Sequence, residues 1–197
     1  PVGLIPDLAK HLISAGGKRL RPLLTVATSL MCGYEGNSHH KLAAAVEFIH
    51  SATLLHDDVV DDSALRRGKK PANLLWGNSP SILVGDFLYS RAFQMLVEIG
   101  QVNIMGTLSS ATNVIAEGEV LQMLNAKNPD VSEQNYLHVI LGKTAMLFEA
   151  ASHTGAQLAE ADPIKTDALR RFGRHLGIAF QLIDDLMDYT GDPATMG

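Results

Sequence analysis

Residues 54–62 read Leu-Leu-His-Asp-Asp-Val-Val-Asp-Asp, and residues 182–189 read Leu-Ile-Asp-Asp-Leu-Met-Asp-Tyr. Each segment contains the pattern Asp-Asp-x-x-Asp among apolar residues whose spacing is typical of a helix. Positions i and i+4 lie about 40° apart on a helix, so the first and last aspartates of each pattern share one face. Carboxylates that close repel each other unless cations join them. The two patterns therefore predict two helices whose acidic faces need partners inside the fold.

Other polar residues lie on the same two helical faces. His50 and Thr53 come about two turns and one turn before Asp57, so they share its stripe. On the second segment, Gln181 precedes Asp184 by about one turn. Most residues around both stripes are apolar, and polar groups buried among them are costly without ligands. Two such faces predict a cage for hard cations such as Mg²⁺, which in turn hold a phosphate ester.

The bulk composition fits one soluble globular domain. The chain has 197 residues, of which 46% are hydrophobic and 19% are charged, and its net charge is −5. Because the acidic residues are clustered, general binding of nucleic acid is not expected. The single cysteine, Cys32, allows no internal disulfide and fits a reducing compartment, so we expect a cytoplasmic protein. The start at Pro1 and the stop at Gly197 both resemble cuts in a longer chain.

Helical periodicity extends over most of the chain, and runs of alternating β-branched residues are few, so the sequence predicts an all-α fold. We expect a single domain over residues 1–197. The expected helices cover residues 3–15, 21–33, 37–60, 80–99, 103–126, 132–155 and 165–190. Asn37, Ser132 and Asp162 stand where they could cap the helices that follow them. The longest irregular stretch is the basic segment 62–79.

Basic residues gather in three places. Residues 16–22 read Gly-Gly-Lys-Arg-Leu-Arg-Pro, a tight turn at a helix start, where free backbone N–H groups also favour anions. Residues 66–70 read Arg-Arg-Gly-Lys-Lys and follow the first acidic pattern, whereas Lys143-Thr144 stands inside an expected helix. Together with the carboxylates, these cations predict two anion pockets, one bridged by metal and one gripped by Arg and Lys.

These motifs, in this order and spacing, resemble those of the trans-isoprenyl diphosphate synthases. The sequence outside these motifs is similar to that of long-chain bacterial members, for example in Asn113-Val-Ile-Ala-Glu-Gly-Glu-Val-Leu-Gln122. The likeness covers essentially the whole chain, but the Lys- and Asp-rich loop that follows the second motif in the family is absent here. The resemblance implies an all-α bundle of the isoprenoid synthase type around a central cavity. It also leads us to expect that the native N-terminus and the C-terminal third are missing.

The resemblance implies a role for each matching residue. It implies Mg²⁺ ligands at Asp57, Asp61, Asp184 and Asp188, with Asp58 and Asp185 beside them as further catalytic carboxylates. It implies that isopentenyl diphosphate is held by Lys18, Arg21, His50 and Arg67. It implies contacts to an allylic diphosphate from Arg66, Lys143, Thr144 and Gln181, with Lys143 also acting in catalysis.

The implied activity is condensation of isopentenyl diphosphate onto an allylic diphosphate, by Mg²⁺-assisted ionisation, condensation and proton elimination in a homodimer. In this family a large aromatic side chain four or five residues before the first motif blocks elongation. Thr53 and Ala52 occupy those positions and are small, so we expect a long product, an octaprenyl chain built on farnesyl diphosphate for a quinone. A product this apolar implies transient contact with a membrane.

Several alternatives remain at this point. A short-chain farnesyl or geranylgeranyl diphosphate synthase would share every motif. A metal phosphohydrolase of the HD type would use His56-Asp57 as its metal dyad, but it would not explain the second acidic pattern. A non-catalytic partner subunit would be expected to lose the acidic motifs, and a terpene cyclase would need no second diphosphate pocket.

Overall fold

The computed structural model of the chain describes residues 3–14, 16–62, 65, 69–125 and 132–190. Within this part of the chain every regular element is a helix, so the predicted all-α fold is confirmed. The elements are α1 (Leu4–Ser14), α2 (Leu20–Met31), α3 (Ser38–Val60), α4 (Ala72–Trp76), α5 (Asn78–Ile99), α6 (Val102–Asn125), α7 (Glu133–Ile140), the π-helical turn η1 (Leu141–Ala145), α8 (Met146–Leu158) and α9 (Pro163–Thr190).

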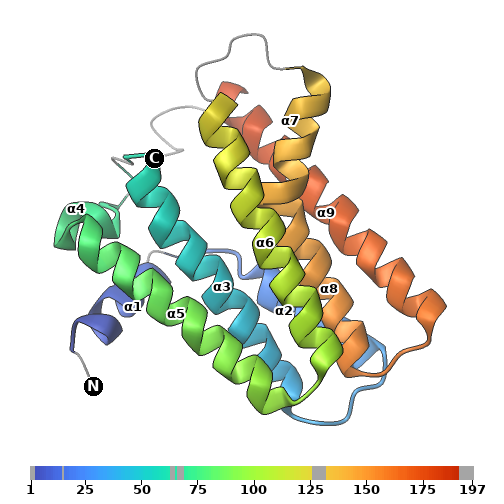
Figure 1. Cartoon of the computed structure of the whole chain (residues 1–197). Helices are drawn as coiled ribbons and strands as arrows, with labels where there is room; N and C mark the ends of the chain where they lie inside the picture. Colours follow the sequence, from blue (N-terminus) through green and yellow to red (C-terminus); the bar gives the residue numbers. More distant parts are fainter. Residues whose placement is uncertain (1–2, 15, 63–64, 66–68, 126–131, 191–197) are drawn as a thin grey trace.

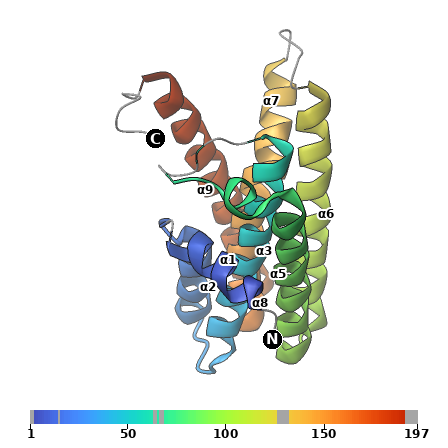
Figure 2. The same cartoon turned by 90° about the vertical axis from the view of Figure 1, so that its left-hand side faces the viewer.

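The long helices form an upright bundle in Figures 1 and 2. Helices α2, α6 and α9 all pack against α8, and α3 packs against α2 and α5. The short helices α1 and α4 pack against α5. Helices α3, α6 and α9 all end at the same end of the bundle, the upper one in both figures. The two acidic patterns, which lie in the last turns of α3 and α9, are therefore carried to one end of the molecule.

Two clusters of buried side chains stabilise this arrangement. The larger joins α3, α5, α6 and α8 through residues such as Leu42, Leu96 and Leu108. The smaller joins α1, α3, α4 and α5 and includes Leu8 and Leu55. Full burial of one aliphatic side chain contributes about 1.5–3 kcal/mol relative to leaving it exposed. The apolar periodicity that predicts the helices therefore also supplies the main driving force for their packing.

Two of the three expected helix caps are confirmed. The Ser132 hydroxyl accepts a hydrogen bond from the backbone N–H of Asn135 at 3.2 Å. A carboxylate oxygen of Asp162 likewise accepts from the backbone N–H of Lys165 at 2.9 Å. Asn37 precedes α3 as expected, but its side chain makes no capping hydrogen bond, and its own backbone is already close to helical, with φ −106° and ψ −5°.

Two departures from the expected helices lie close to the predicted site. Segment 62–79 is not irregular throughout, because it contains the short helix α4 and the start of α5. The helix predicted over residues 132–155 extends to Leu158 and is interrupted by η1. At this turn the chain approaches α6 closely, since a Cβ at Gly118 would lie 3.1 Å from the backbone nitrogen of Lys143. Such π turns are rare and are frequent at functional sites.

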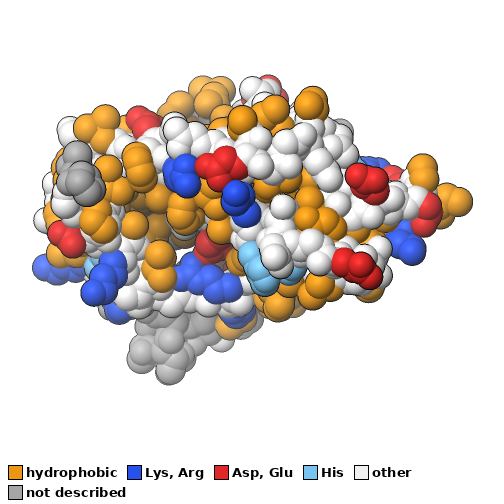
Figure 3. All heavy atoms as spheres, turned by 90° about the horizontal axis from the view of Figure 1, so that it is seen from below, with side chains coloured by type: hydrophobic (Ala, Val, Ile, Leu, Met, Phe, Trp, Pro, Cys, Tyr) orange, Lys and Arg blue, Asp and Glu red, His pale blue; other side chains and the backbone are white. Residues whose placement is uncertain are grey.

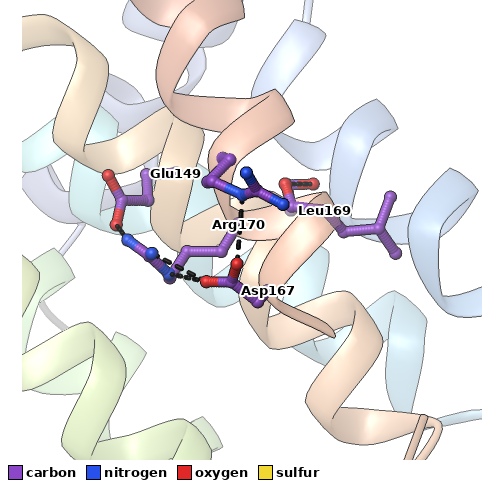
Figure 4. Close-up of polar contacts among 6 residues, drawn as sticks. Glu149, Asp167, Leu169 and Arg170 are labelled. Carbon is purple, nitrogen blue, oxygen red and sulfur yellow. Dashed lines mark hydrogen bonds and ion pairs between the residues drawn. The ribbon is translucent and has the colours of Figure 1, made fainter. Parts of the chain in front are cut away.

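The lower half of α9 is tied to α8 by polar contacts that Figure 4 shows. The Arg170 guanidinium donates to Glu149 of α8 at 2.9 Å and to Asp167 of its own helix at 2.8 Å. The Ser152 hydroxyl on α8 donates to the backbone carbonyl of Leu169 at 2.8 Å. These contacts fix the start of α9 on the bundle well before the helix reaches its acidic pattern.

The surface is chemically mixed on the face seen from below. Figure 3 shows small separate groups of acidic and basic side chains lying between exposed hydrophobic ones over the described part of that face. Exposed apolar side chains include Leu23 and Met31 on α2 and Ile164 and Phe172 on α9. Even so, none of the helices within the described ranges combines the length and the hydrophobicity that crossing a membrane requires.

Glycines allow neighbouring helices to approach α8 at backbone distance. A Cβ at Gly155 of α8 would lie 2.0 Å from the Thr28 hydroxyl and 2.7 Å from the carbonyl oxygen of Thr25, both on α2. On α9, a Cβ at Gly173 would lie 2.5 Å from the carbonyl oxygen of Phe148. No methyl group fits at these distances unless a helix moves.

We therefore expect Gly155→Ala to destabilise the protein by about 1–3 kcal/mol through overpacking, which corresponds to a Tm lower by roughly 3–10 °C. Gly106→Ala on α6 is the matched control, because no heavy atom lies within 4 Å of its Cβ position. That control gains helix propensity and should be neutral or more stable by up to about 1 kcal/mol. Thermal and urea unfolding of both variants check this, and equal stability of the two would contradict the close packing of α2 on α8.

Candidate functional site

The glycine-rich turn before α2 builds one wall of a pocket. Gly16, Gly17 and Arg19 all have positive φ, of 87°, 139° and 50°. Glycine adopts such angles at little cost, whereas for Arg19 they are strained and require support. That support comes from its guanidinium, which forms an ion pair with Glu47 of α3 and donates to the carbonyl of Ile13 at 2.9 Å. The charge of Arg19 is thus already balanced within the protein.

The other cations of this turn point to aromatic faces in the same pocket. The Arg21 guanidinium lies 4.3 Å from the ring centroid of Phe148, and the Lys18 ammonium lies 5.5 Å from that of Phe180. Nη1 of Arg21 also lies 3.3 Å from Nε2 of His50 on α3. Aromatic faces hold a cation in place without neutralising it. The pocket, about 370 Å³ in volume, therefore offers positive charge to an anion.

Asp184 from the second acidic pattern lines the same pocket. Burial raises the pKa of Asp184, and the ammonium of Lys18 partly offsets that rise. The neighbouring carboxylates of Asp188 and Asp185 raise the pKa further, whereas the charge of Arg21 lowers it. A carboxylate whose charged form is disfavoured in this way gains from a further cation. The pocket thus brings a group suited to a metal ion next to groups suited to a phosphate.

The first acidic pattern forms the end of α3. The Asp58 side chain is fully buried, and the side-chain amide of Asn73 on α4 donates to the Asp58 backbone carbonyl at 3.0 Å. Asp57 is half-buried and lines a second cavity of about 470 Å³ between α3, α5 and α6. Asp61, the C-terminal cap of α3, is exposed. Helix α4, which the sequence did not predict, thus secures the end of the helix that carries these carboxylates.

Of the two residues expected to set product length, only Thr53 lines the cavity beside Asp57. Thr53 lines this cavity together with Tyr89 and Ile115. Ala52 is fully buried and belongs to the apolar cluster around Leu55 instead. Successive positions on a helix point about 100° apart, so only one of the two can face the cavity.

His56 takes part in contacts with α5. Its Nε2 lies 3.4 Å from a carboxylate oxygen of Asp86 and 3.2 Å from the carbonyl oxygen of Ile82. Its ring also lies over Gly85, where a Cβ would be only 2.4 Å from Nε2. His56 and Asp57 line the same cavity, but these contacts with α5 already engage one of the two ring nitrogens that a metal dyad could use.

A third pocket contains three of the four residues of the expected allylic site, Lys143, Thr144 and Gln181. The Thr144 hydroxyl donates to the side-chain carbonyl of Gln181 at 2.7 Å, and the Gln181 amide donates to Oδ1 of Asp185 at 2.7 Å. The ammonium of Lys143 forms an ion pair with Glu119 of α6 at 3.0 Å. Four of the expected residues therefore meet where η1 passes between α6 and α9.

Tyr136 of α7 completes this group, and the sequence reasoning missed it. Its phenol donates to Oδ2 of Asp185, and this hydrogen bond raises the pKa of Tyr136 to about 12. The phenol therefore stays protonated and remains a donor at neutral pH. A signal was available, because Tyr136 stands two turns before Lys143 on one helix and a tyrosine hydroxyl near a carboxylate usually has a partner.

The structure thus distributes the expected site residues over three neighbouring pockets. Lys18, Arg21 and His50 lie with Asp184; Thr53 lies with Asp57; and Lys143, Thr144 and Gln181 lie with Asp185. Arg66 and Arg67 lie outside the described residues. The pockets adjoin, because His50 and Thr53 belong to consecutive turns of α3 and Lys143 reaches Glu119 in the wall beside Asp57.

The carboxylates fit a divalent cation by their chemistry. They offer only oxygen ligands, which Mg²⁺ and Ca²⁺ prefer, and Asp184 lies where a cation would relieve an unfavourable charge. In the ranges that the structure describes, no three carboxylate, imidazole or thiol groups converge on one point. Mg²⁺ typically takes one or two carboxylates from a protein and completes its shell with water and substrate phosphate.

Comparison with known proteins agrees with the motifs and the fold. The family model of polyprenyl synthetase matches residues 3–197. Octaprenyl diphosphate synthase from Escherichia coli K12 is 53% identical over 196 residues, which cover 100% of this chain and 61% of that protein. A geranylgeranyl diphosphate synthase from Saccharolobus solfataricus is 37% identical, over 98% of this chain and 60% of that protein.

A solved structure supports the same assignment. Polyprenyl synthase from Caulobacter crescentus CB15, complexed with calcium and isoprenyl diphosphate, is 55% identical and superimposes with a TM-score of 0.96, over 100% of this chain and 60% of that one. The chain thus spans about three fifths of the length of these relatives. A match of this extent, in both sequence and structure, shows that the chain belongs to the polyprenyl synthetase family.

Proposed function

We propose that the protein is a long-chain trans-polyprenyl diphosphate synthase, which condenses isopentenyl diphosphate onto an allylic diphosphate. The observation that carries this proposal is the pocket in which Asp184 lies beside Lys18, Arg21 and His50. It joins a carboxylate suited to a metal ion with cations suited to a diphosphate. The carboxylates of α3 lie at the same end of the bundle, so a second diphosphate has ligands nearby.

Mg²⁺ is the metal that we propose, held by Asp57 and Asp61 on α3 and by Asp184 and Asp188 on α9. When bound, it would neutralise charge on the diphosphate and so make that group easier to expel. The Caulobacter crescentus protein was solved with calcium, which is also a divalent cation, and with isoprenyl diphosphate, and this is consistent with a divalent cation and a diphosphate at the site proposed here. The all-oxygen ligand set of this chain is the independent support.

The side chains of the chain suit both substrates. Lys18, Arg21 and His50 would hold isopentenyl diphosphate, since two of these cations are fixed on aromatic faces. Lys143, Thr144 and Gln181 would hold the allylic diphosphate, with Arg66 of the basic segment as a further ligand. Arg67 of the same segment would join the group that holds isopentenyl diphosphate. Fixed positive charge at this place favours the transition state, in which negative charge accumulates on the leaving diphosphate.

The reaction that follows requires no protein nucleophile. The allylic C–O bond breaks, and both of its electrons leave with the diphosphate. The double bond of isopentenyl diphosphate then attacks the allylic carbocation, and a proton is lost from the new cation to the released diphosphate, which restores a double bond. Water would quench the carbocation, so the apolar walls that Phe148, Phe180 and Ile115 supply protect the reaction.

We further propose an octaprenyl product made from farnesyl diphosphate and used as a quinone side chain. The 53% identity to an octaprenyl synthase, against 37% to a geranylgeranyl synthase, favours the long product over a short one. Thr53 is small and faces the cavity beside Asp57, which leaves room for a growing chain. We also propose that the protein is a cytoplasmic homodimer that contacts a membrane transiently when it releases its product.

Asp184→Asn tests the proposed activity directly. With farnesyl diphosphate, labelled isopentenyl diphosphate and Mg²⁺, the protein should elongate the primer, and sizing of the extracted lipid measures this. The variant should lose about a hundredfold or more of this activity, because it lacks a ligand of the metal ion that would stabilise the developing negative charge. Its Tm without metal should stay equal or rise by roughly one or two degrees, because burial disfavours the carboxylate that is removed.

Asp7→Asn is the control for this experiment, since Asp7 is exposed on α1 and lines none of the three pockets. It should keep full activity. Hydrolysis of farnesyl diphosphate without elongation would instead favour a phosphohydrolase, and loss of activity in both variants would show that the effect of Asp184→Asn is not specific.

Thr53→Phe tests the assignment of the cavity. A phenyl ring at this position should fill space beside Asp57 and shorten the product by several isoprene units, while kcat for the first condensation changes little. Ala52→Phe is the matched comparison, because Ala52 is fully buried in the apolar cluster and a large ring there should cost about 1–3 kcal/mol of stability. Chromatography of the products shows the outcome, and an unchanged product length in Thr53→Phe would refute the assignment.

Arg21→Met tests the basic pocket. Methionine keeps the apolar contact with Phe148 but lacks the charge, and loss of a charge-assisted hydrogen bond should raise KM for isopentenyl diphosphate about 10- to 100-fold. KM for the allylic substrate should change far less. Lys10→Met, at an exposed position of α1, serves as the control. Steady-state kinetics with each substrate varied in turn measure both KM values. An equal rise in both would contradict separate pockets for the two diphosphates.

A further inference from the structure

We propose that Tyr136 is a positioning residue, which holds the second acidic motif in place through its hydrogen bond to Asp185. This hydrogen bond links α7 to α9, and we call the link the strut. The inference rests on the proposed function, because it concerns how the proposed metal ligands Asp184 and Asp188 are held beside the residues proposed to bind the allylic diphosphate. It gives the adjacent carboxylates Asp184 and Asp185 two different roles, since Asp184 would bind the metal ion and Asp185 would hold the helix in place.

The hydrogen bonds of Asp185 carry the argument. Its Oδ2 accepts from the phenol of Tyr136 on α7, and its Oδ1 accepts from the amide of Gln181 on α9 at 2.7 Å. The Gln181 carbonyl in turn accepts from the Thr144 hydroxyl on η1 at 2.7 Å. One continuous chain of hydrogen bonds therefore links α7, α9 and the π turn. Both carboxylate oxygens of Asp185 are already engaged within the protein.

Asp184 lies in quite different surroundings, although it is the preceding residue. Successive side chains on a helix point about 100° apart, so Asp184 turns toward the pocket of Lys18 and Arg21 while Asp185 turns toward η1. A group that faces an anion pocket can bind a metal ion with substrate. A group whose two oxygens accept hydrogen bonds from α7 and α9 can fix the helix instead.

The last turns of α9 need such a contact. Their apolar side chains are largely exposed: Leu182, Ile183, Leu186 and Met187 keep 42–55% of their surface accessible. The lower half of the helix is held on α8 by Arg170 and by the backbone carbonyl of Leu169, as Figure 4 shows, but these contacts lie several turns away. Figure 2 shows that the upper end of α9 leans away from α7. Directional hydrogen bonds must therefore set the orientation of Asp184 and Asp188.

Hydrogen exchange of the metal-free protein tests the strut without reference to activity. Tyr136→Phe removes one hydroxyl and should speed exchange of the amides in residues 182–190 about five- to tenfold, as expected for the loss of one solvent-accessible hydrogen bond. Tyr189→Phe is the matched control, because Tyr189 lies on the same end of α9 and is 92% exposed. It should leave exchange unchanged. Equal exchange in the wild type and Tyr136→Phe would overturn the proposal.

Kinetics supply the second measurement. In Tyr136→Phe the Mg²⁺ concentration for half-maximal activity and KM for the allylic substrate should both rise several-fold, while KM for isopentenyl diphosphate stays constant. A purely structural defect would change all three together. The double variant Tyr136→Phe/Asp185→Asn should lose little more than Asp185→Asn alone, because both changes break one strut. Additive losses would show that the two residues act independently and would overturn the proposal.

The two proposals can fail separately. If the wild-type protein does not elongate a primer, the proposed function fails, and the exchange experiment still decides whether Tyr136 holds the end of α9. If elongation is normal but exchange and Mg²⁺ dependence do not respond to Tyr136→Phe, only the strut is refuted.

Discussion

The site depends on how closely α2 and α9 approach α8. Gly155 lets α2 lie almost in backbone contact with α8, and Gly173 does the same for α9. Because of this approach, Arg21 on α2 reaches the ring of Phe148 on α8, and Phe180 on α9 reaches both that ring and Lys18. Cations and aromatic rings from three helices thereby meet in one pocket. A single added methyl group at these glycines would separate the elements that make it.

The charges around this pocket are not all available to a ligand. Arg19 is balanced by Glu47 and supports a strained backbone, whereas Arg21 and Lys18 rest on aromatic faces. Neighbouring cations of one short turn thus have different tasks, since one shapes the turn and two face the pocket. The same division recurs in the second acidic motif, where Asp184 faces the cations and Asp185 accepts hydrogen bonds from Tyr136 and Gln181.

Much of this could be predicted from the sequence, because helical periodicity and the i, i+4 spacing of carboxylates depend only on local geometry. The all-α fold, the basic turn and the grouping of Thr144 with Gln181 follow from such patterns or from the family resemblance. The rotation of one helix against its neighbours does not. It decides that Thr53 faces a cavity while Ala52 joins an apolar cluster, and no local pattern distinguishes the two. The unforeseen helix α4 likewise depends on a tertiary contact, the hydrogen bond from Asn73 to the end of α3.

The π turn η1 has a consequence for how this stretch of chain can vary. A π turn contains one more residue than the α-helical turn that it replaces. Removing a residue from Leu141–Ala145 would restore a regular helix and rotate α7 by about 100° relative to α8, so that Tyr136 would no longer point at α9. The length of this segment is therefore fixed by geometry, and a one-residue deletion would be far more disruptive here than in an ordinary loop.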